Sequence, residues 1–149
     1  MCGIAGWVDW ERDLNGQGPV VRQMTNAISH RGPDGEGLWL SSRAALGHRR
    51  LIVIDPEGGT QPMVCHDNGH DYVLTYNGEI YNFKELRQEL KARGHRFSSH
   101  SDTEVLLHSY LEWKDECVDH LNGIFAFAIW DGKKNQLFIA RDHLGVKPL

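Results

Sequence analysis

The chain has 149 residues, 40% hydrophobic content and a net charge of −4, values that fit one soluble domain. This charge argues against the strongly basic class of nucleic-acid-binding proteins, and no apolar run approaches the roughly 18 residues of a membrane span. Charged residues from Asp9 onward predict that there is no signal peptide. Three widely spaced cysteines, Cys2, Cys65 and Cys117, predict free thiols in a reducing, cytoplasmic setting.

The first 62 residues alternate between strand-like, helix-like and turn-like composition. Apolar spacing, Pro19 at a helix start and β-branched runs indicate these elements. The expected elements are, in chain order, a buried strand at 3–10, a helix at 19–30, a turn at 31–35, strands at 37–41 and 44–54, and a loop at 55–62.

The second half of the chain is expected to hold a strand, two helices and a hairpin. Asn82 and Ser101 are each followed three residues later by glutamate, a capping-box pattern that marks helix starts. The expected elements are a strand at 71–76 ending at Asn77-Gly78, helices at 82–94 and 101–113, a strand at 124–130, a turn at 131–135 and a strand at 137–140. Tight turns favour antiparallel pairing, and strands that are apolar on both faces need cover on both sides. The pattern therefore predicts two stacked antiparallel sheets with helices outside.

Cys2 directly follows the initiator methionine, and it is the first candidate for chemistry. Removal of Met1, which is usual before a small residue, would make Cys2 the N-terminus. Its α-amine titrates near 7.7–8.0 in model peptides and can take the proton of its own thiol, so one residue supplies nucleophile and base. A retained Met1 would move the amine one residue away. The simpler alternative is that Cys2 is a small hydrophobe that packs.

Three further positions could serve a thiol nucleophile, although each has an ordinary structural explanation. Asn77 and Gly78 could donate an amide N–H and a backbone N–H to an oxyanion, but Asn-Gly is also typical of a hairpin turn. Arg50 could bind a carboxylate, or it could be a solvated charge. Asp102 could bind an ammonium group, or it could be a carboxylate favoured at a helix start.

The chain resembles the glutaminase domain of class II glutamine amidotransferases, which are N-terminal nucleophile hydrolases, and is most similar to the glutamine-hydrolysing asparagine synthetase branch. Eight strings, in family order and over essentially the whole chain, carry this resemblance. They are MCGIAG (1–6), HRGPDG (30–35), GHRRLIVID (47–55), GTQP (59–62), YNGEIYNF (76–83), SDTEVLL (101–107), NGIFAFAIWD (122–131) and ARDHLGVKPL (140–149).

The resemblance implies a fold, a reaction and a set of site residues. The fold is α+β, a four-layer α/β/β/α sandwich of two antiparallel sheets, with residues 1–149 forming one glutaminase domain. The reaction is hydrolysis of glutamine to glutamate and ammonia through a γ-glutamyl thioester. The implied roles are Cys2 as nucleophile and base, Asn77 and Gly78 as oxyanion donors, Arg50 with the segment Leu51, Ile52, Val53 and Ile54 around the α-carboxylate, and Glu79 and Asp102 at the α-ammonium group.

The resemblance also sets expectations for partners and cofactors. No nucleotide-binding loop of the G-x-x-x-x-G-K or S-G-G-x-D-S kind occurs in the sequence, so a synthetase domain that accepts the ammonia is expected to lie outside this chain. The glutaminase reaction needs no cofactor, and ATP and magnesium are expected only in that synthetase domain. L-glutamine is the expected ligand, a homodimer is allowed, and neither nucleic acid nor membrane is expected as a partner.

Alternatives to catalysis stay open at this point. The domain could bind glutamine without hydrolysing it, as a regulatory module, it could be an inert fragment, or it could hydrolyse a different amide. Nine histidines also invite a metal site, with Cys65, His66 and His70 or Cys117 and His120 as ligands. Their spacing matches no standard zinc pattern, so no metal site is predicted.

Overall fold

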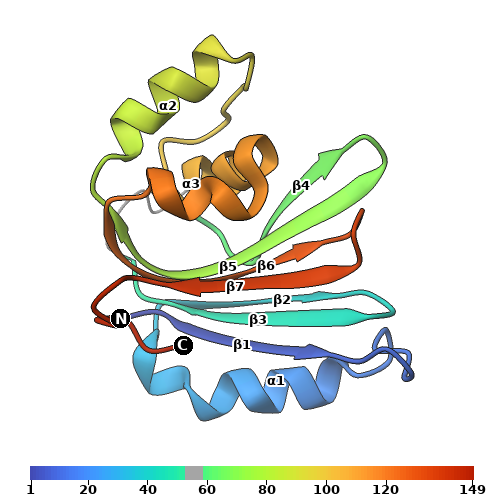
Figure 1. Ribbon diagram of the computed structural model, residues 1–149. Coiled ribbons are helices and arrows are strands. Elements are labelled where there is room, and N and C mark those ends of the chain that lie inside the picture. Colours follow the sequence, from blue (N-terminus) through green and yellow to red (C-terminus); the bar gives the residue numbers. More distant parts are fainter. Residues whose placement is uncertain (53–58) are drawn as a thin grey trace.

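Two antiparallel sheets are stacked face to face in the computed structural model, which describes residues 1–52 and 59–149 (Figure 1). The first sheet has the order β1-β3-β2 and consists of β1 (Gly3–Val8), β2 (Gly35–Leu40) and β3 (Ala44–Arg50). The second has the order β4-β5-β6-β7 and consists of β4 (Met63–Asp67), β5 (His70–Ile80), β6 (Gly123–Asp131) and β7 (Gln136–Arg141).

Helices cover the outer faces of both sheets. Helix α1 (Gly18–Ala27) lies against the first sheet, whereas α3 (Asp102–Trp113) covers the second and packs beside α2 (Phe83–Ala92) (Figure 1). Short 3₁₀ helices, Ser29–Arg31 and Lys114–His120, follow α1 and α3. The layers are therefore α/β/β/α, which confirms the predicted sandwich. Among residues 1–52 and 59–149 the longest helix has 12 residues, too short to cross a bilayer.

The alternation of side chains along β5 explains why this strand is apolar on both faces. Tyr72 and Leu74 belong to the largest hydrophobic cluster, on the side of α2 and α3. Val73 belongs to a second cluster that fills the space between the sheets, where it packs with Leu46 and Trp130. Because successive side chains of a strand point to opposite faces, β5 buries both of its faces and holds the middle of the sandwich.

The predicted helix caps are confirmed only in part. The Ser101 hydroxyl accepts the backbone N–H of Thr103 at 3.1 Å, so Ser101 is the N-cap of α3. Glu104 was expected to complete a reciprocal capping box, but its carboxylate accepts hydrogen bonds from Ser98 and Ser99 instead.

Asn82 stands at the N-cap position of α2, yet its side chain does not cap the helix. Its amide nitrogen donates to the carbonyl of His120, and its amide oxygen accepts the N–H of Asn122. The capping-box prediction is therefore wrong at this helix, because a long-range tie to the segment before β6 uses the same polar groups.

Three strands end two or more residues away from their predicted last residue. β1 ends at Val8 rather than at residue 10, because the Asp9 carboxylate accepts two backbone N–H groups and starts a turn. β3 ends at Arg50 rather than at residue 54, and Val53 and Ile54 lie outside the described residues.

β5 continues to Ile80, because β6 pairs with it as far as Gly123. Asn77 and Gly78 therefore lie inside this strand instead of just past its end, which corrects the prediction that the strand stops at residue 76. β4 was not predicted from the sequence at all.

Candidate active site

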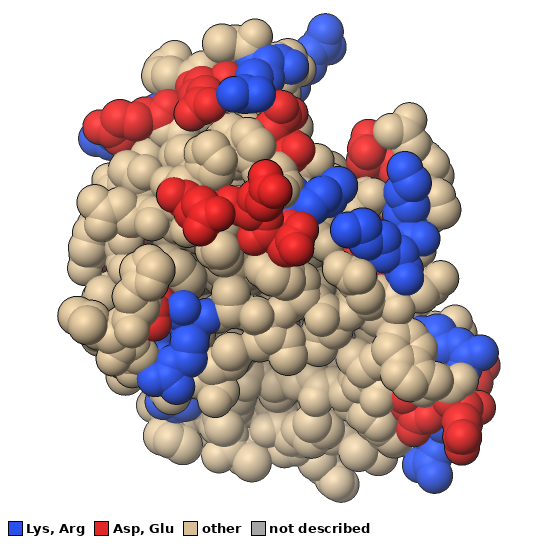
Figure 2. Space-filling model, in the orientation of Figure 1, with Lys and Arg blue, Asp and Glu red and all other residues tan. Residues whose placement is uncertain are grey.

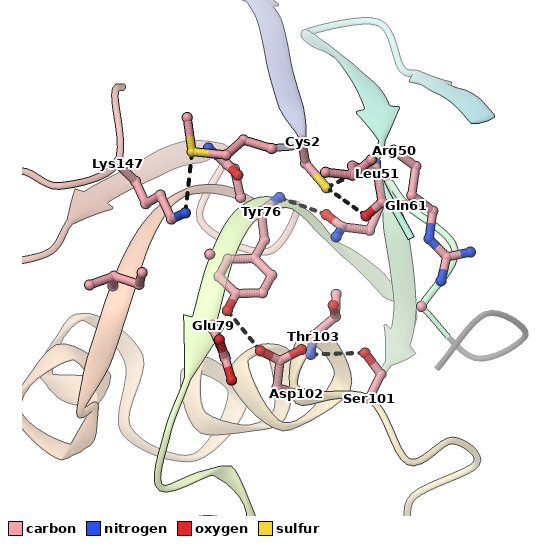
Figure 3. Close-up of a pocket in the computed structure, with 15 residues that line it drawn as sticks. Cys2, Arg50, Leu51, Gln61, Tyr76, Glu79, Ser101, Asp102, Thr103 and Lys147 are labelled. Carbon is pink, nitrogen blue, oxygen red and sulfur yellow. Dashed lines mark hydrogen bonds between the residues drawn. The ribbon is translucent and has the colours of Figure 1, made fainter. Parts of the chain in front are cut away.

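A cavity of about 200 Å³ lies at the end of the sandwich where β1 begins and β3 ends, beside the second half of β5 (Figure 3). Of the residues proposed from the sequence, those that line it are Cys2, Arg50, Leu51, Asn77, Gly78, Glu79 and Asp102. The two sheets and the start of α3 thus bring together side chains that are up to 100 positions apart in the sequence.

Cys2 lies directly before β1 and is held there by contacts with Arg31 and with Leu51, the residue that follows β3. The backbone N–H of Leu51 donates to the Cys2 sulfur at 3.3 Å, and the thiol faces the Leu51 carbonyl at 3.6 Å. The Arg31 side chain donates to the Cys2 carbonyl at 3.1 Å. This position follows from the β1–β3 register, which pairs Gly3 with Arg49 and so sets the preceding residue beside the end of β3.

The segment after β3 contributes less to the cavity than the sequence suggested. Arg50 and Leu51 line the cavity, and Figure 3 shows both close to Cys2. Ile52 does not line it: this residue is 40% exposed, and its N–H donates to the Asp34 carboxylate at 2.9 Å. The predicted contributions of Val53 and Ile54 fall on residues that the structure does not describe.

The second half of β5 has an open edge that faces the cavity. β4 pairs with β5 only as far as Leu74, so the next outward-facing backbone groups need other partners. The N–H of Tyr76 donates to the side-chain oxygen of Gln61 at 2.6 Å, and the N–H of Ile80 donates to the Asp102 carboxylate at 3.1 Å. Because alternate N–H groups of a strand point to the same edge, the N–H of Gly78 points out between them.

Gly78 lines the cavity, and this alternation directs its N–H away from β6, toward the cavity side of the strand. A Cβ atom at this position would overlap the carbonyl oxygen of Ile124 and approach the Cα of Phe125 to 2.7 Å. Glycine is therefore required by the close approach of β6.

Asn77 is 3% exposed and shares a face of β5 with Val73 and Thr75, which look into the space between the sheets. At the open end of that space it reaches the cavity that also holds Cys2. A carboxamide and a backbone N–H from adjacent residues thus border the space beside a thiol. This is the donor set that a tetrahedral oxyanion needs.

Asp102 opens α3 and is 5% exposed. Its Oδ2 atom accepts the Tyr76 hydroxyl at 2.8 Å and the Ile80 N–H (Figure 3). Burial raises the pKa of Asp102, although these hydrogen bonds to its carboxylate lower it in part. Burial and the neighbouring Asp102 carboxylate also raise the pKa of Tyr76, so the phenol stays protonated as a donor. A buried carboxylate in this setting favours a cationic ligand.

Several residues that line the cavity were not proposed from the sequence. All of them occur in the strings that carry the family resemblance, for example Gln61 in GTQP and Lys147 in ARDHLGVKPL, so the signal was present without an assigned role. The full set of additional lining residues is Met1, Gly59, Gln61, Tyr76, Ser101, Thr103, Ile124 and Lys147.

Lys147 reaches the cavity through a turn organised by Asp142. The Asp142 carboxylate accepts the N–H groups of Val146 and Lys147 at 2.8 and 3.0 Å, and that of Phe125 at 3.2 Å. The Lys147 ammonium then contacts the sulfur of Met1 at 3.3 Å (Figure 3). The turn therefore places a second cationic side chain, besides Arg50, at the cavity.

Charged groups elsewhere on the surface are mixed. On the face shown in Figure 2, lysine and arginine side chains are interspersed with acidic ones and form no continuous basic field. Within the described ranges, no three His, Cys, Asp or Glu side chains come together as metal ligands.

Comparison with known proteins places the chain in a family. Residues 1–149 match the model of the glutamine amidotransferase domain, and the chain belongs to that family. It is 57% identical over 148 residues to asparagine synthetase [glutamine-hydrolyzing] 3 of Bacillus subtilis (strain 168), with 99% of this chain and 24% of that protein covered. It is 41% identical over 149 residues to asparagine synthetase B [glutamine-hydrolyzing] of Escherichia coli (strain K12), with 100% and 26% covered.

Solved structures agree on the fold. The glutamine phosphoribosylpyrophosphate amidotransferase of B. subtilis, solved with ADP and GMP, superposes with a TM-score of 0.75 at 21% identity, over 95% of this chain and 37% of that one. At this identity the similarity establishes the fold alone. The chain spans about a quarter of the length of the curated relatives that it matches.

Proposed function

We propose that this domain hydrolyses the side-chain amide of L-glutamine to glutamate and ammonia, with Cys2 as the nucleophile. One observation carries the proposal: a thiol, the outward-facing strand-edge N–H of Gly78, the Arg50 side chain and the buried Asp102 carboxylate all line one cavity. Each group alone has an ordinary explanation, but their convergence has none in packing.

The two charged ends of free glutamine match the two sides of the cavity. Arg50, at the end of β3, would bind the α-carboxylate, and the Leu51 backbone lies beside it. Asp102 and Glu79 would receive the α-ammonium group on the other side. A substrate without one of these groups would leave a charged side chain in the cavity without its partner, which is unfavourable and gives selectivity for the free amino acid.

The first half of the reaction forms a thioester. After removal of Met1, the Cys2 α-amine takes the thiol proton and the thiolate sulfur attacks the side-chain carbonyl carbon of glutamine. The carbonyl oxygen becomes an oxyanion that accepts the Gly78 N–H and the Asn77 amide. The protonated amine then gives its proton to the amide nitrogen, the C–N bond breaks, and ammonia leaves a γ-glutamyl thioester on Cys2.

The second half regenerates the enzyme. Water attacks the thioester carbonyl while the same α-amine takes one of its protons, and the oxyanion again faces Asn77 and Gly78. Collapse of the intermediate breaks the C–S bond, the sulfur recovers the proton from the amine, and glutamate is released. No group outside this chain is required by these steps, so we propose that the glutaminase reaction uses no cofactor.

The names of the relatives support a use for the ammonia. Both are asparagine synthetases described as glutamine-hydrolysing, and this chain matches about a quarter of each. We propose that the domain, over residues 1–149, supplies ammonia to a synthetase domain of that kind, where ATP and magnesium would act. The free cysteines are consistent with a cytoplasmic location, which we also propose.

Glutamine binding without hydrolysis is a second candidate, because Arg50 and Asp102 line the cavity whether or not Cys2 has a free α-amine. If Met1 is retained, the proposed base is displaced while Arg50 and Asp102 can still bind the substrate.

Three measurements on one preparation separate these functions. Mass spectrometry of the N-terminal peptide determines whether Met1 is present, calorimetry measures glutamine binding, and an enzymatic assay measures glutamate release. We expect Met1 to be absent, with both binding and turnover. Binding without turnover in a chain that begins at Cys2 would contradict the hydrolase proposal and support a regulatory module, and the absence of both would indicate an inert fragment.

A further inference from the structure

Directly behind the cavity, a buried histidine joins the two sheets. His48 in β3 is 0% exposed, and its Nδ1 atom lies 3.1 Å from the hydroxyl of Thr75 in β5. That hydroxyl donates to the carbonyl of Gly47 at 3.3 Å, so it must accept from His48, whose Nδ1 therefore carries the proton. The hydrogen-bond chain runs from one sheet to the other and back.

The other ring nitrogen of His48 makes this residue hard to explain by stability. Nε2 is buried and has no hydrogen-bond partner among the described residues. A buried, unpaired acceptor is unfavourable, and an apolar side chain of similar volume would avoid it. The surrounding layer is otherwise apolar, with Leu46, Val73 and Trp130 filling the space between the sheets.

Strand registers relate this hydrogen bond to the site. His48 precedes Arg50 by two residues in β3, and it pairs with Ile4, which follows Cys2 by two residues in β1. Thr75 precedes Asn77 by two residues in β5. Because residues two apart share a face, the His48–Thr75 pair forms the layer immediately inside the site, about 7 Å along each strand.

The groups of the proposed reaction are divided between the sheets. The first sheet carries the nucleophile Cys2 and the carboxylate clamp Arg50, whereas the second carries the oxyanion donors Asn77 and Gly78. Apolar contacts between stacked sheets have no preferred direction, but a hydrogen bond fixes both distance and orientation. A shift of about 1 Å in such an arrangement can lower a rate by about 100-fold.

From this juxtaposition we infer that His48 and Thr75 are positioning residues, whose hydrogen bond holds the two sheets at the spacing at which Cys2 faces Asn77 and Gly78. The inference rests on the proposed glutaminase function. It assigns no contact with substrate to either residue, and both act through the strands that they join.

Thr75→Val tests the inference, because it removes the hydroxyl while keeping the shape of the side chain. Thr25→Val is the matched control: Thr25 is also fully buried, its hydroxyl donates to the Val21 carbonyl, and it packs against β3 from the α1 side. Thr75→Ser is the rescue variant, since serine keeps the hydroxyl. Thermal melting measures the stability of each variant.

We expect Thr75→Val to lower kcat/KM for glutamine by about 10–100-fold, Thr25→Val to lower it by less than about threefold, and Thr75→Ser to recover most of the loss. Alkylation of Cys2 by iodoacetamide should proceed equally in all three, because it needs only the first sheet. Equal kcat/KM in the two valine variants, or no recovery with serine, would overturn the inference.

Two further readouts keep the inference testable apart from turnover. In the unmodified chain, NMR of the histidine side chains should show that His48 carries a slowly exchanging proton on Nδ1 and that its Nε2 is unprotonated. The opposite tautomer would overturn the inference even if no valine variant folds. If the unmodified chain releases no glutamate, the proposed function fails, but the inference can still be tested by labelling Cys2. The ratio of labelling by a glutamine-like diazoketone to labelling by iodoacetamide measures how well Cys2 is aligned with Asn77 and Gly78. An unchanged ratio in Thr75→Val would overturn the inference.

Discussion

The two halves of β5 have the same backbone conformation but different surroundings. From Tyr72 to Leu74 the strand is paired on both edges, with β4 on one side and β6 on the other. From Tyr76 to Ile80 it is paired only with β6, and its outward N–H groups meet Gln61, the cavity and Asp102. The first half has its backbone groups committed to the sheet, whereas the second half keeps one N–H available for chemistry.

This difference shows how a sheet can supply a catalytic donor without a special loop. Ending β4 early exposes a short length of edge, and the side chains of Gln61 and Asp102 occupy the positions on either side of Gly78. The remaining N–H is held rigidly by the β5–β6 pairing, so it requires no reorganisation when an oxyanion forms. Changes in the open half should therefore alter activity, and changes in the paired half should alter stability.

The largest effect is expected opposite the open half, at the nucleophile. Cys2→Ala should abolish glutamate release, because no other described thiol lines the cavity, while the melting temperature stays close to that of the unmodified chain. Glutamate release and thermal melting are the measurements. Turnover retained in this variant would refute the assignment of Cys2.

Asn77→Ala should lower kcat by about 10²–10³-fold, as the loss of an oxyanion donor does in other acyl-transfer enzymes. The matched change in the paired half is Val73→Ala, which truncates a fully buried side chain and should lower stability by about 2–3 kcal/mol without a comparable loss of kcat. Steady-state kinetics and urea unfolding of both variants make the comparison. An effect of Asn77→Ala on KM alone would place Asn77 in substrate binding instead.

Asp102→Asn should weaken glutamine binding without lowering stability. Burial raises the pKa of this carboxyl, so its negative charge does not stabilise the fold, and a neutral amide oxygen can still accept from Tyr76 and Ile80. For the same reason, glutamine affinity of the unmodified chain should fall with decreasing pH, starting above the range in which an exposed aspartate titrates. Calorimetry across pH and thermal melting test both statements, and a variant that melts much lower with unchanged affinity would contradict them.

The smallest effect concerns the acid stability of the layer behind the site. Burial, with a smaller contribution from the Arg50 charge, lowers the pKa of His48 from 6.5 to about 3. Between pH 6.5 and about pH 3 the unfolded chain therefore binds a proton at this residue, while the folded chain does not. The free energy of unfolding consequently decreases as the pH is lowered through this window, by at most about 1.4 kcal/mol per pH unit. Urea unfolding at several pH values between 7 and 4 should show that the free energy of unfolding depends less steeply on pH in His48→Asn than in the unmodified chain. An identical slope would show that His48 is not buried in its neutral form.

Local patterns predicted most of the fold, because the strands of the hairpin at β6–β7 and the N-cap at Ser101 depend on short-range sequence. They missed β4, whose side chains alternate between half-buried and exposed positions at the sheet edge and give little apolar signal. They also stopped β5 at Asn77-Gly78, a pair typical of turns, because its pairing with β6 across more than 40 residues leaves no local trace.

The sequence predicted Cys2, Arg50 and Asp102 as site residues, and the structure shows that all three line one cavity. The roles of Gln61 and Tyr76 could not be predicted in the same way. Tyr76 has the pattern of a core aromatic residue, and its hydroxyl meets Asp102 only after the helix packs on the sheet. The side-chain oxygen of Gln61 accepts the Tyr76 N–H at the edge of β5, in the place of a neighbouring strand. No rule based on residue spacing predicts such a contact.

Covalent trapping tests the central claim most directly. A glutamine-like diazoketone should react with the chain once, the modified residue mapped by mass spectrometry should be Cys2, and excess glutamine should protect it. Cys65 and Cys117 are internal controls, because burial raises the pKa of both thiols, that of Cys117 to about 12. Modification of either control thiol in place of Cys2, or labelling of Cys2 that glutamine does not slow, would contradict the account.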